Sequence, residues 1–541
     1  MPDVLIQTVQ PFEGQKPGTS GLRKKTAVFR SPGYLESYVQ SVFDAIGGVA
    51  GKTMVLGGDG RFFAAEAAQT ILRMAAANGA ARAIVGQGAL LSTPAASHLI
   101  RLRGADFGIV LSASHNPGGP EGDFGVKLNL GNGGPAPEGV TEAIHALSRT
   151  IDRYRTLATD DIDLSATGAT TLGAMTVEIV DPVADYADLM AGLFDFAAIR
   201  ALFARGFRMR FDAMNAVTGP YAREILERRL GAAPGTVVNA VPLSDFGGLH
   251  PDPNPTWAAD LVALMNAPGA PDFAAASDGD GDRHMILGPG VYVSPSDSFA
   301  VLAANAHLAP GYARGLAGVA RSMPTSSAVD RVAAALGIEC HETPTGWKFF
   351  GTLLDAGRAT LCGEESFGAG SDHVREKDGL WAVLLWLDIL AARGEGVAAV
   401  MEDHWRRFGR TWYSRHDYEA LPQAVADRVI DGLRRQLAEL PGRTVCGLTV
   451  TGADDFAYVD PVDGTATAGQ GLRVRLSDEA RFVLRLSGTG TEGATLRLYL
   501  ERHGDDWHGE VQDRLAEVAA AAEEIAGIRR LTGRAGPHVV T

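Results

Sequence analysis

Cysteine is scarce in this chain: Cys340, Cys362 and Cys446 are the only three among 541 residues. An odd, widely spaced set fits reduced thiols better than a disulfide framework or a zinc site. The sequence also has no run of about 18 apolar residues, the length that a membrane-spanning helix needs. Its N-terminus lacks the basic start and apolar core of a secretory signal. We therefore predict a cytoplasmic protein with no membrane partner.

Positive charge is in the minority, because 49 lysines and arginines stand against 64 aspartates and glutamates and the net charge is -15. Nucleic-acid backbones are held by broad basic surfaces, so this balance argues against a nucleic-acid partner. A small anionic substrate is compatible with it, since charges are screened beyond about 8 to 10 Å and local clusters then decide. Basic clusters of this kind occur at residues 23–25 and 375–377.

The chain is long enough for several domains. Hydrophobic residues make up 46% of it, and at roughly 100 to 200 residues per domain we expect three or four. Apolar runs alternate with helical stretches from residue 53, again after a polar passage at 156–174, and again from Tyr292. This order predicts three similar α/β layered domains with mixed sheets, followed by a C-terminal α+β domain. The predicted domains are 1–172, 173–290, 291–403 and 404–541.

The most specific motif is Asp278-Gly-Asp280-Gly-Asp282-Arg283. Carboxylates at alternate positions of an extended segment fall on one side, and hard oxygen ligands indicate Mg²⁺ or Ca²⁺. An EF-hand is excluded, because its sixth position is Arg283 instead of Gly and its twelfth is Pro289 instead of Glu. The alternative is a polar Asp/Gly turn, but three close carboxylates would repel one another without a cation.

A second motif, Gly488-Thr-Gly490-Thr-Glu-Gly493, has the spacing of a dinucleotide-binding fingerprint. That fingerprint must open a helix, whereas here alternating apolar residues on both sides predict a strand, a loop and a strand. Such a loop can cradle a phosphate through its amides, hydroxyls and flanking arginines, although a plain Gly-rich hairpin is the alternative. The side chains concerned are Ser487, Thr489, Thr491, Arg485 and Arg497.

A third motif, Ser112-Ala-Ser114-His-Asn-Pro117, follows the apolar run Phe107–Leu111, which reads as a buried strand. Pro117 prevents the strand from continuing, so the Ser114 hydroxyl is presented at the end of the strand. The motif lacks the glycines of a serine-hydrolase elbow, and a simple strand-end turn is the alternative. Together with the aspartates and the Gly-rich loop, however, Ser114 would complete a set of groups for phosphoryl transfer.

Two further stretches are ambiguous by themselves. Residues 16–25 combine a Gly/Thr/Ser turn with the three adjacent cations at 23–25, which by default is a solvated basic surface. Residues 362–368, Cys-Gly-Glu-Glu-Ser-Phe-Gly, would suit sugar hydroxyls but are equally typical of a capped turn.

Taken together, these motifs resemble the α-D-phosphohexomutase family, and most closely its phosphoglucomutase branch. The resemblance covers nearly the whole chain. It is carried by residues 17–23, 112–119, 122–127, 250–254, 278–283, 342–348, 363–368 and 485–490. The loop Gly363-Glu-Glu-Ser-Phe-Gly368 is similar to that of the glucose enzymes, and not to that of the dual-specificity phosphomannomutases.

The resemblance implies four domains around one deep cleft, to which each domain contributes a loop. It implies that Ser114 carries the transferable phosphoryl group, and that Ser114, Asp278, Asp280 and Asp282 bind Mg²⁺. His115, Lys127 and Lys377 are then the candidates for proton transfer, and the sequence does not rank them. The substrate-binding residues that it implies are Thr19, Ser20, Arg23, Arg283, Thr345, Gly346, Glu364, Ser366, Lys377, Ser487, Gly488, Thr489, Gly490, Thr491 and Arg497.

The predicted function is therefore the interconversion of glucose 1-phosphate and glucose 6-phosphate, with hexose phosphates as partners and glucose 1,6-bisphosphate as intermediate and activator. Phosphoryl transfer from Ser114 would form the bisphosphate, which turns around and returns its other phosphoryl group to Ser114. The alternatives are a phosphomannomutase or phosphoglucosamine mutase, a metal-dependent phosphatase, and a non-catalytic sugar-phosphate-binding relative. We expect a monomer or a weak homodimer.

Overall fold

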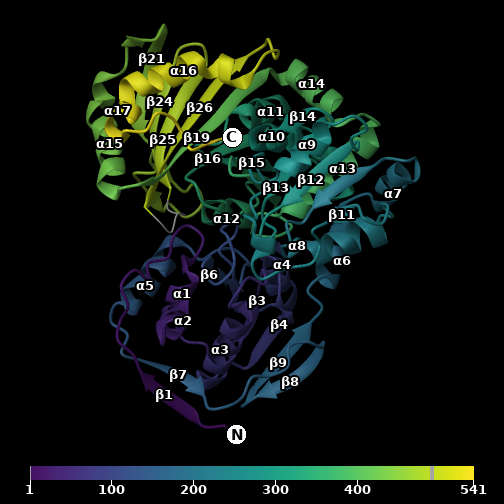
Figure 1. The fold of residues 1–541 in the computed structure, drawn as a ribbon, viewed down its shortest axis with the longest axis vertical. Helices are drawn as coiled ribbons and strands as arrows, with labels where there is room; N and C mark the ends of the chain where they lie inside the picture. Colours follow the sequence, from purple (N-terminus) through teal and green to yellow (C-terminus); the bar gives the residue numbers. More distant parts are fainter. Residues whose placement is uncertain (1, 488–492) are drawn as a thin grey trace.

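The computed structural model describes residues 2–487 and 493–541. Four units follow one another along the chain, and Figure 1 shows the first at the bottom and the fourth at the top left. Three units have parallel strands between helices, and the fourth has an antiparallel sheet, so the predicted fold class is confirmed. In the described part of the chain, no helix has the length and apolar character needed to cross a membrane.

The first unit is built on a seven-stranded sheet of order β2-β6-β5-β3-β4-β9-β8, in which β5, β3, β4 and β9 are parallel. Strand β9 lies beyond residue 172, so this sheet extends past the predicted first boundary. The strands are β2 (Leu22–Lys25), β3 (Thr53–Gly58), β4 (Arg82–Leu90), β5 (Phe107–Leu111), β6 (Asp123–Leu130), β8 (Gly168–Leu172) and β9 (Met175–Val180). The helices are α1 (Thr26–Phe29), α2 (Tyr34–Ala45), α3 (Ala64–Ala77), α4 (Thr93–Arg103) and α5 (Glu138–Ser148), and β1 (Val4–Thr8) pairs with β7 (Arg153–Leu157).

The second unit has a five-stranded sheet of order β11-β10-β12-β13-β14, parallel at β10 and antiparallel after β12. Its strands are β10 (Met209–Asp212), β11 (Val237–Val238), β12 (Phe273–Ser277), β13 (His284–Gly288) and β14 (Val291–Val293). Its helices are α6 (Ala184–Leu193), α7 (Phe196–Ala204), α8 (Thr218–Ala222) and α9 (Ala259–Asn266), with a π-helix at Arg223–Arg229 and a 3₁₀ turn at Phe246–Gly248.

The third unit repeats this plan with the order β16-β15-β17-β18. Its strands are β15 (Gly318–Ser322), β16 (Glu339–Thr343), β17 (Leu361–Glu364) and β18 (Gly368–Ser371). Its helices are α10 (Pro295–Asn305), α11 (Ala328–Leu336), α12 (Lys348–Asp355), α13 (Gly379–Arg393) and α14 (Val397–Phe408), with 3₁₀ turns at Ala306–Leu308 and Pro310–Tyr312.

The fourth unit has an antiparallel sheet of order β20-β21-β24-β25-β26-β19-β27, and residues of α15 and α16 share its apolar core. Its strands are β19 (Arg410–Leu421), β20 (Thr444–Val445), β21 (Leu448–Asp455), β24 (Leu472–Leu476), β25 (Ala480–Ser487), β26 (Ala494–Gly504) and β27 (Val539–Val540). Its helices are α15 (Gln423–Gln436), α16 (Val511–Ala526) and α17 (Ile528–Thr532), with a 3₁₀ turn at Leu437–Glu439, and β22 (Tyr458–Val459) pairs with β23 (Ala466–Thr467).

One helix binds the middle of the molecule together. α13 is apolar almost all round, so it is stable only where other elements cover every side. Residues Gly379–Leu390 are all buried, and Trp381 and Trp386 belong to a single core that spans the first, second and third units. The N-terminus of α13 is therefore fixed next to the loop between β12 and β13, which carries the three aspartates.

Candidate active site

Ser114 lies in the loop that follows β5 and is only 1% exposed. Its φ of +56° is left-handed, a conformation that is uncommon for residues other than glycine and tends to occur at functional sites. Two hydrogen bonds hold it there. The Ser114 amide donates to Ser112 Oγ at 2.7 Å, and the Ser114 carbonyl accepts from Arg61 Nη2 at 2.7 Å.

Arg61 is the clamp on this loop. Its side chain is fully buried beside Asp59, to which Nε donates at 2.9 Å, and Nη1 donates to the carbonyl of Asp123 at 2.7 Å. Neither residue was among the predicted site residues. A signal existed, because Gly58-Asp59-Gly60-Arg61 follows a buried parallel strand next to β5, and the carboxyl ends of such strands meet at one edge of the sheet.

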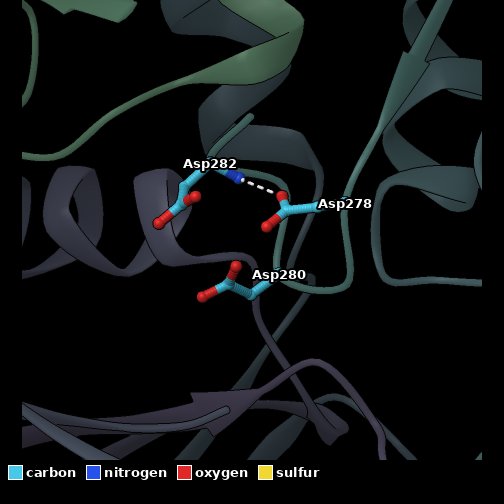
Figure 2. Close-up of side chains that lie close together, drawn as sticks. All are labelled: Asp278, Asp280 and Asp282. Carbon is cyan, nitrogen blue, oxygen red and sulfur yellow. Dashed lines mark hydrogen bonds between the residues drawn. The ribbon is translucent and has the colours of Figure 1, made fainter. Parts of the chain in front are cut away.

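The three predicted aspartates converge in the β12–β13 loop. Asp278, Asp280 and Asp282 are buried, and one oxygen from each lies within 4.8 Å of the others. Figure 2 shows the three carboxylates turned toward a common centre. Asp278 Oδ1 accepts the amides of Asp282 and Arg283 at 2.9 and 3.1 Å, which closes the loop.

The serine and aspartate loops meet directly. Ser114 Oγ donates to Asp278 Oδ2 at 2.9 Å. Glycine is required at this contact, because a Cβ on Gly279 would lie 2.4 Å from the Ser114 carbonyl oxygen. The alternating glycines of the motif therefore allow the close approach of two loops from different units, as well as the turn itself.

Cations surround the carboxylates. Lys127 is paired with Asp280, Lys377 Nζ lies 3.1 Å from Asp282, and Arg283 Nε lies 3.7 Å from Asp278. Burial and the neighbouring carboxylates raise the pKa of Asp278 well above its ordinary value. The pKa of Asp280 is lowered despite its burial, because Lys127 is so close.

The donor set fits a hard divalent cation. The Oδ1 atoms of Asp280 and Asp282 are buried and have no hydrogen-bond partner within the described residues. Buried carboxylate oxygens of this kind are costly unless something pairs with them, and oxygen-only sites suit Mg²⁺. Thr93 also supports the loop, since its Oγ1 donates to Asp280 at 2.6 Å. Thr93 was not among the predicted site residues.

Two of the proton-transfer candidates have different surroundings. His115 Nδ1 lies 3.3 Å from Ser114 Oγ, and burial together with the charge of Arg283 lowers the pKa of His115 well below its ordinary value. Lys127 Nζ lies 3.3 Å from Thr93 Oγ1, and although burial opposes it, Asp280 raises the pKa of Lys127. At neutral pH the imidazole is therefore neutral, whereas the ammonium stays charged.

The predicted sugar-binding residues also come together. Glu364 Oε1 accepts the amide of Gly346 at 2.9 Å, and a Cβ on Gly346 would lie 3.7 Å from the side chain of Thr19. Thr345 Oγ1 and Arg23 Nη1 are buried without a hydrogen-bond partner in the described part of the chain. Loops from the first and third units thus meet around polar atoms that a bound hydroxyl or phosphate could satisfy.

Ser20 and Ser366 lie half-buried in these same two loops.

The fourth unit faces the same region. The charge of Arg497, on β26, is among the causes that lower the pKa of His115. Arg415 Nε and Arg497 Nε lie 3.2 and 3.5 Å from the carboxylate of Asp417. Arg415 and Asp417 were not predicted. Ser487 ends β25, and the predicted residues Gly488, Thr489, Gly490 and Thr491 lie outside the described residues.

Four family models match in order along the chain. They are the phosphoglucomutase/phosphomannomutase α/β/α domains I, II and III over residues 14–155, 184–290 and 295–408, and the phosphoglucomutase-1 C-terminal domain over 410–538. The chain belongs to the phosphoglucomutase/phosphomannomutase family.

Full-length relatives agree with this membership. A phosphoglucomutase of Rhizobium radiobacter is 57% identical over 99% of this chain and all of its own length. Human phosphoglucomutase-1 is 48% identical over the full length of both chains. The crystal structure of the open form of parafusin, a phosphoglucomutase from Paramecium, superimposes with a TM-score of 0.92 at 45% identity and covers 100% of this chain and 99% of its own.

These relatives confirm the resemblance and the enzyme class that the sequence predicted. The function predicted for this chain, phosphoglucomutase, is the one that the family members above carry in their names. The domain boundaries and the roles of individual site residues stay predictions.

Proposed function

We propose that this chain is a Mg²⁺-dependent phosphoglucomutase that interconverts glucose 1-phosphate and glucose 6-phosphate through a phosphorylated Ser114 and glucose 1,6-bisphosphate. The observation that carries the proposal is the 2.9 Å hydrogen bond from Ser114 Oγ to Asp278, one of three clustered carboxylates. A hydroxyl in this position becomes a phosphate ester next to a cation site, which is the arrangement that phosphoryl transfer requires.

Asp278, Asp280 and Asp282 would hold Mg²⁺ together with an oxygen of the Ser114 phosphate. A bound Mg²⁺ would supply positive charge to the phosphoryl oxygens. The protein adds charge of its own, because Lys127, Lys377 and Arg283 all lie beside the carboxylates. A phosphoserine brings nearly two negative charges at neutral pH, and these three cations offset part of it.

In the transfer step, the bond from phosphorus to Ser114 Oγ breaks while a bond from phosphorus to a sugar hydroxyl oxygen forms. The sugar hydroxyl loses a proton, and Ser114 Oγ gains one. We assign the exchange at Ser114 Oγ to His115, whose Nδ1 lies 3.3 Å away on a neutral ring. Lys127, which stays charged beside Asp280, stabilises charge, and Lys377 is the candidate for the proton of the sugar hydroxyl.

The bisphosphate must then turn around, so the site needs a second phosphate position. Arg23, Thr345 and Glu364 surround the sugar region, and Arg497 with the loop after Ser487 would hold the distal phosphate. Arginine suits this task because its guanidinium offers paired donors to phosphate oxygens. Closure of the fourth unit would exclude water as a competing acceptor.

Glucose is the proposed sugar, because residues 363–368 read Gly-Glu-Glu-Ser-Phe-Gly. The cytoplasmic location and the monomeric or weakly dimeric state stay predictions, and relatives such as that of Arabidopsis thaliana are named chloroplastic.

The deciding experiment compares the turnover of glucose, mannose and glucosamine 1-phosphates by the purified protein with Mg²⁺ and catalytic bisphosphate. We expect glucose 6-phosphate to form fastest. Release of inorganic phosphate at a comparable rate would indicate a phosphatase, and faster turnover of mannose or glucosamine phosphate would reassign the substrate.

A further inference from the structure

A chain of buried hydrogen bonds ends at the residue next to Lys377. Trp381 Nε1 donates to the Tyr312 hydroxyl at 2.7 Å, and Tyr312 lies 2.5 Å from Ser371 Oγ. Ser371 Oγ lies 2.7 Å from His373 Nδ1, and His373 Nε2 lies 2.9 Å from Asp378 Oδ2. These hydrogen bonds close into a ring at Trp381. Asp378, the N-cap of α13, accepts the backbone amide of Trp381 on its Oδ1 at 3.0 Å.

The donors and acceptors of this ring have one complete order. Tyr312 donates to Ser371, Ser371 donates to Nδ1 of His373, and Nε2 of His373 donates to Asp378, so each hydroxyl and ring proton is used once. Tyr186 adds a bond from α6 of the second unit, since its hydroxyl donates to Asp378 Oδ1 at 2.6 Å. Burial raises the pKa of Tyr186 well above its ordinary value and keeps this donor protonated.

The ring acts on the metal-site region through the backbone around Asp378. The amide of Asp378 donates to the carbonyl of Ala369 at 2.8 Å, and the next amide, that of Gly379, donates to the carbonyl of Gly281 at 3.0 Å. Gly281 lies within the aspartate loop. The residue before Asp378 is Lys377, whose Nζ lies 3.1 Å from Asp282. The N-cap residue Asp378 therefore fixes both Lys377 and the aspartate loop that Lys377 faces.

Serine, histidine and aspartate in this order are also the residue types of a hydrolase triad. Ser371 and Asp378 are 0% exposed, and the side chain of His373 is 1% exposed, so no substrate reaches the serine. Satisfied buried networks of this kind fix geometry instead.

We propose that His373 and Asp378, supported by Ser371, Tyr312 and Tyr186, are positioning residues that hold Lys377 and the aspartate loop in register for phosphoryl transfer. The proposal rests on the proposed mutase function for its kinetic consequence. Its structural consequence, a rigid contact between Gly379 and Gly281, is independent of that function.

The test compares His373→Gln with His373→Asn. A Gln amide can reach the position of Nε2 and keep a donor to Asp378, whereas an Asn amide reaches only the position of Nδ1. We expect His373→Asn to lower kcat per phosphorylated Ser114 about tenfold with KM unchanged, because small misplacements of a reacting group cost up to about 100-fold. His373→Gln should stay within about threefold of wild type. Intact-protein mass after incubation with glucose 1,6-bisphosphate counts the phosphorylated sites.

Hydrogen exchange gives the second readout. The amide of Gly379 should exchange faster in His373→Asn than in wild type and near the wild-type rate in His373→Gln. His404→Asn is the matched control, because His404 is a buried histidine of the third unit whose Nδ1 has no hydrogen-bond partner in the described residues. It should change neither kcat per site nor the exchange of Gly379.

Tyr186→Phe and Tyr312→Phe serve if the histidine variants do not fold. The loss of kcat per site and the increase in the Gly379 exchange rate should be larger for Tyr186→Phe than for Tyr312→Phe. Tyr186 donates to Asp378 directly, whereas Tyr312 reaches Asp378 only through Ser371 and His373. Equal kinetics of His373→Asn and wild type per phosphorylated site, or an unchanged exchange rate of Gly379, would overturn the proposal. Absence of mutase turnover in the wild type would overturn the proposed function alone, since the exchange rates still decide whether the network positions the loop.

Discussion

The hydroxyl of Ser114 donates to the carboxylate of Asp278 across 2.9 Å, and this one bond joins two loops whose residues are 164 positions apart in the sequence. The first loop follows β5 of the first unit and the second follows β12 of the second unit. Both strands end at the same junction, because the aspartate loop packs its Gly279 against the Ser114 backbone. The site therefore exists only where two units are correctly packed.

Ser114→Ala should abolish mutase turnover and leave the fold intact. The side chain is small and its hydroxyl makes no bond that closes a secondary-structure element, so the melting temperature should stay near that of the wild type. Ser41→Ala is a matched control, since it removes a buried hydroxyl of α2 that donates to the carbonyl of Ser37 in the same helix. Turnover by purified Ser114→Ala above the background of the coupled assay would refute the assignment of the phosphoryl carrier.

Arg61→Met should destabilise the protein. Removing one partner of a buried ion pair leaves the other uncompensated, at a cost of about 3 to 5 kcal/mol, and Asp59 and Arg61 are both 0% exposed. Urea unfolding measures the loss. Arg61→Lys keeps a charge beside Asp59 but not the forked donors to the two carbonyls. It should therefore lower kcat while destabilising the protein less than Arg61→Met does. The control is Arg73→Lys, because Arg73 pairs with Asp161 at a partly exposed position. Equal stability of Arg61→Met and wild type would contradict the role of Arg61 in holding the Ser114 loop.

Chelation of Mg²⁺ should stop turnover, and added Mg²⁺ should stabilise the protein. A ligand at 100 times its Kd contributes about 2.7 kcal/mol, and here it would also pair the two unpartnered oxygens of Asp280 and Asp282. Thermal unfolding with and without Mg²⁺ gives the shift. Asp280→Asn should lose most of the Mg²⁺-induced shift, whereas the control Asp505→Asn, at an exposed position, should keep it. A Mg²⁺ shift that survives in Asp280→Asn would place the cation elsewhere.

Acid should weaken the contact between the third and fourth units. Glu342 is partly buried, yet Arg321 and Arg473 lower its pKa to about 2. A lowered folded pKa gives stability that is present above the ordinary glutamate value and lost as the pH falls toward about 2. This contribution is at most about 3 kcal/mol. Melting temperatures between about pH 5 and about pH 3 should fall less steeply in Glu342→Gln than in wild type, and parallel slopes would contradict the assignment.

Motif chemistry predicted much of this site. The alternating aspartates could be found from sequence because ligand spacing within one loop is a local property, and the geometry brings Asp278, Asp280 and Asp282 together. Ser114 was found because an apolar strand ends directly before it. The meeting of the two loops was implied by the family resemblance and could not be read from either motif.

Residues that act through tertiary contacts were missed for a physical reason. In the sequence, Asp59 and Arg61 look like an ordinary charged pair. Only the parallel pairing of β3 with β5 brings Arg61 within hydrogen-bond distance of the Ser114 carbonyl. Likewise, Asp378 reads as a helix cap, and its link to the aspartate loop depends on how α13 is buried between two units. Sheet order and helix burial are long-range properties that local patterns do not determine.

The path of one labelled phosphoryl group tests directly whether Ser114 is the phosphoryl carrier. The protein is incubated with glucose 1,6-bisphosphate labelled in phosphate, the labelled residue is located by peptide mapping, and unlabelled glucose 1-phosphate is then added. We expect the label on Ser114 alone, at one per chain, and its release as labelled glucose bisphosphate and glucose 6-phosphate at the rate of turnover. Label on another residue, or turnover faster than the release of label from Ser114, would show that Ser114 is not the phosphoryl carrier.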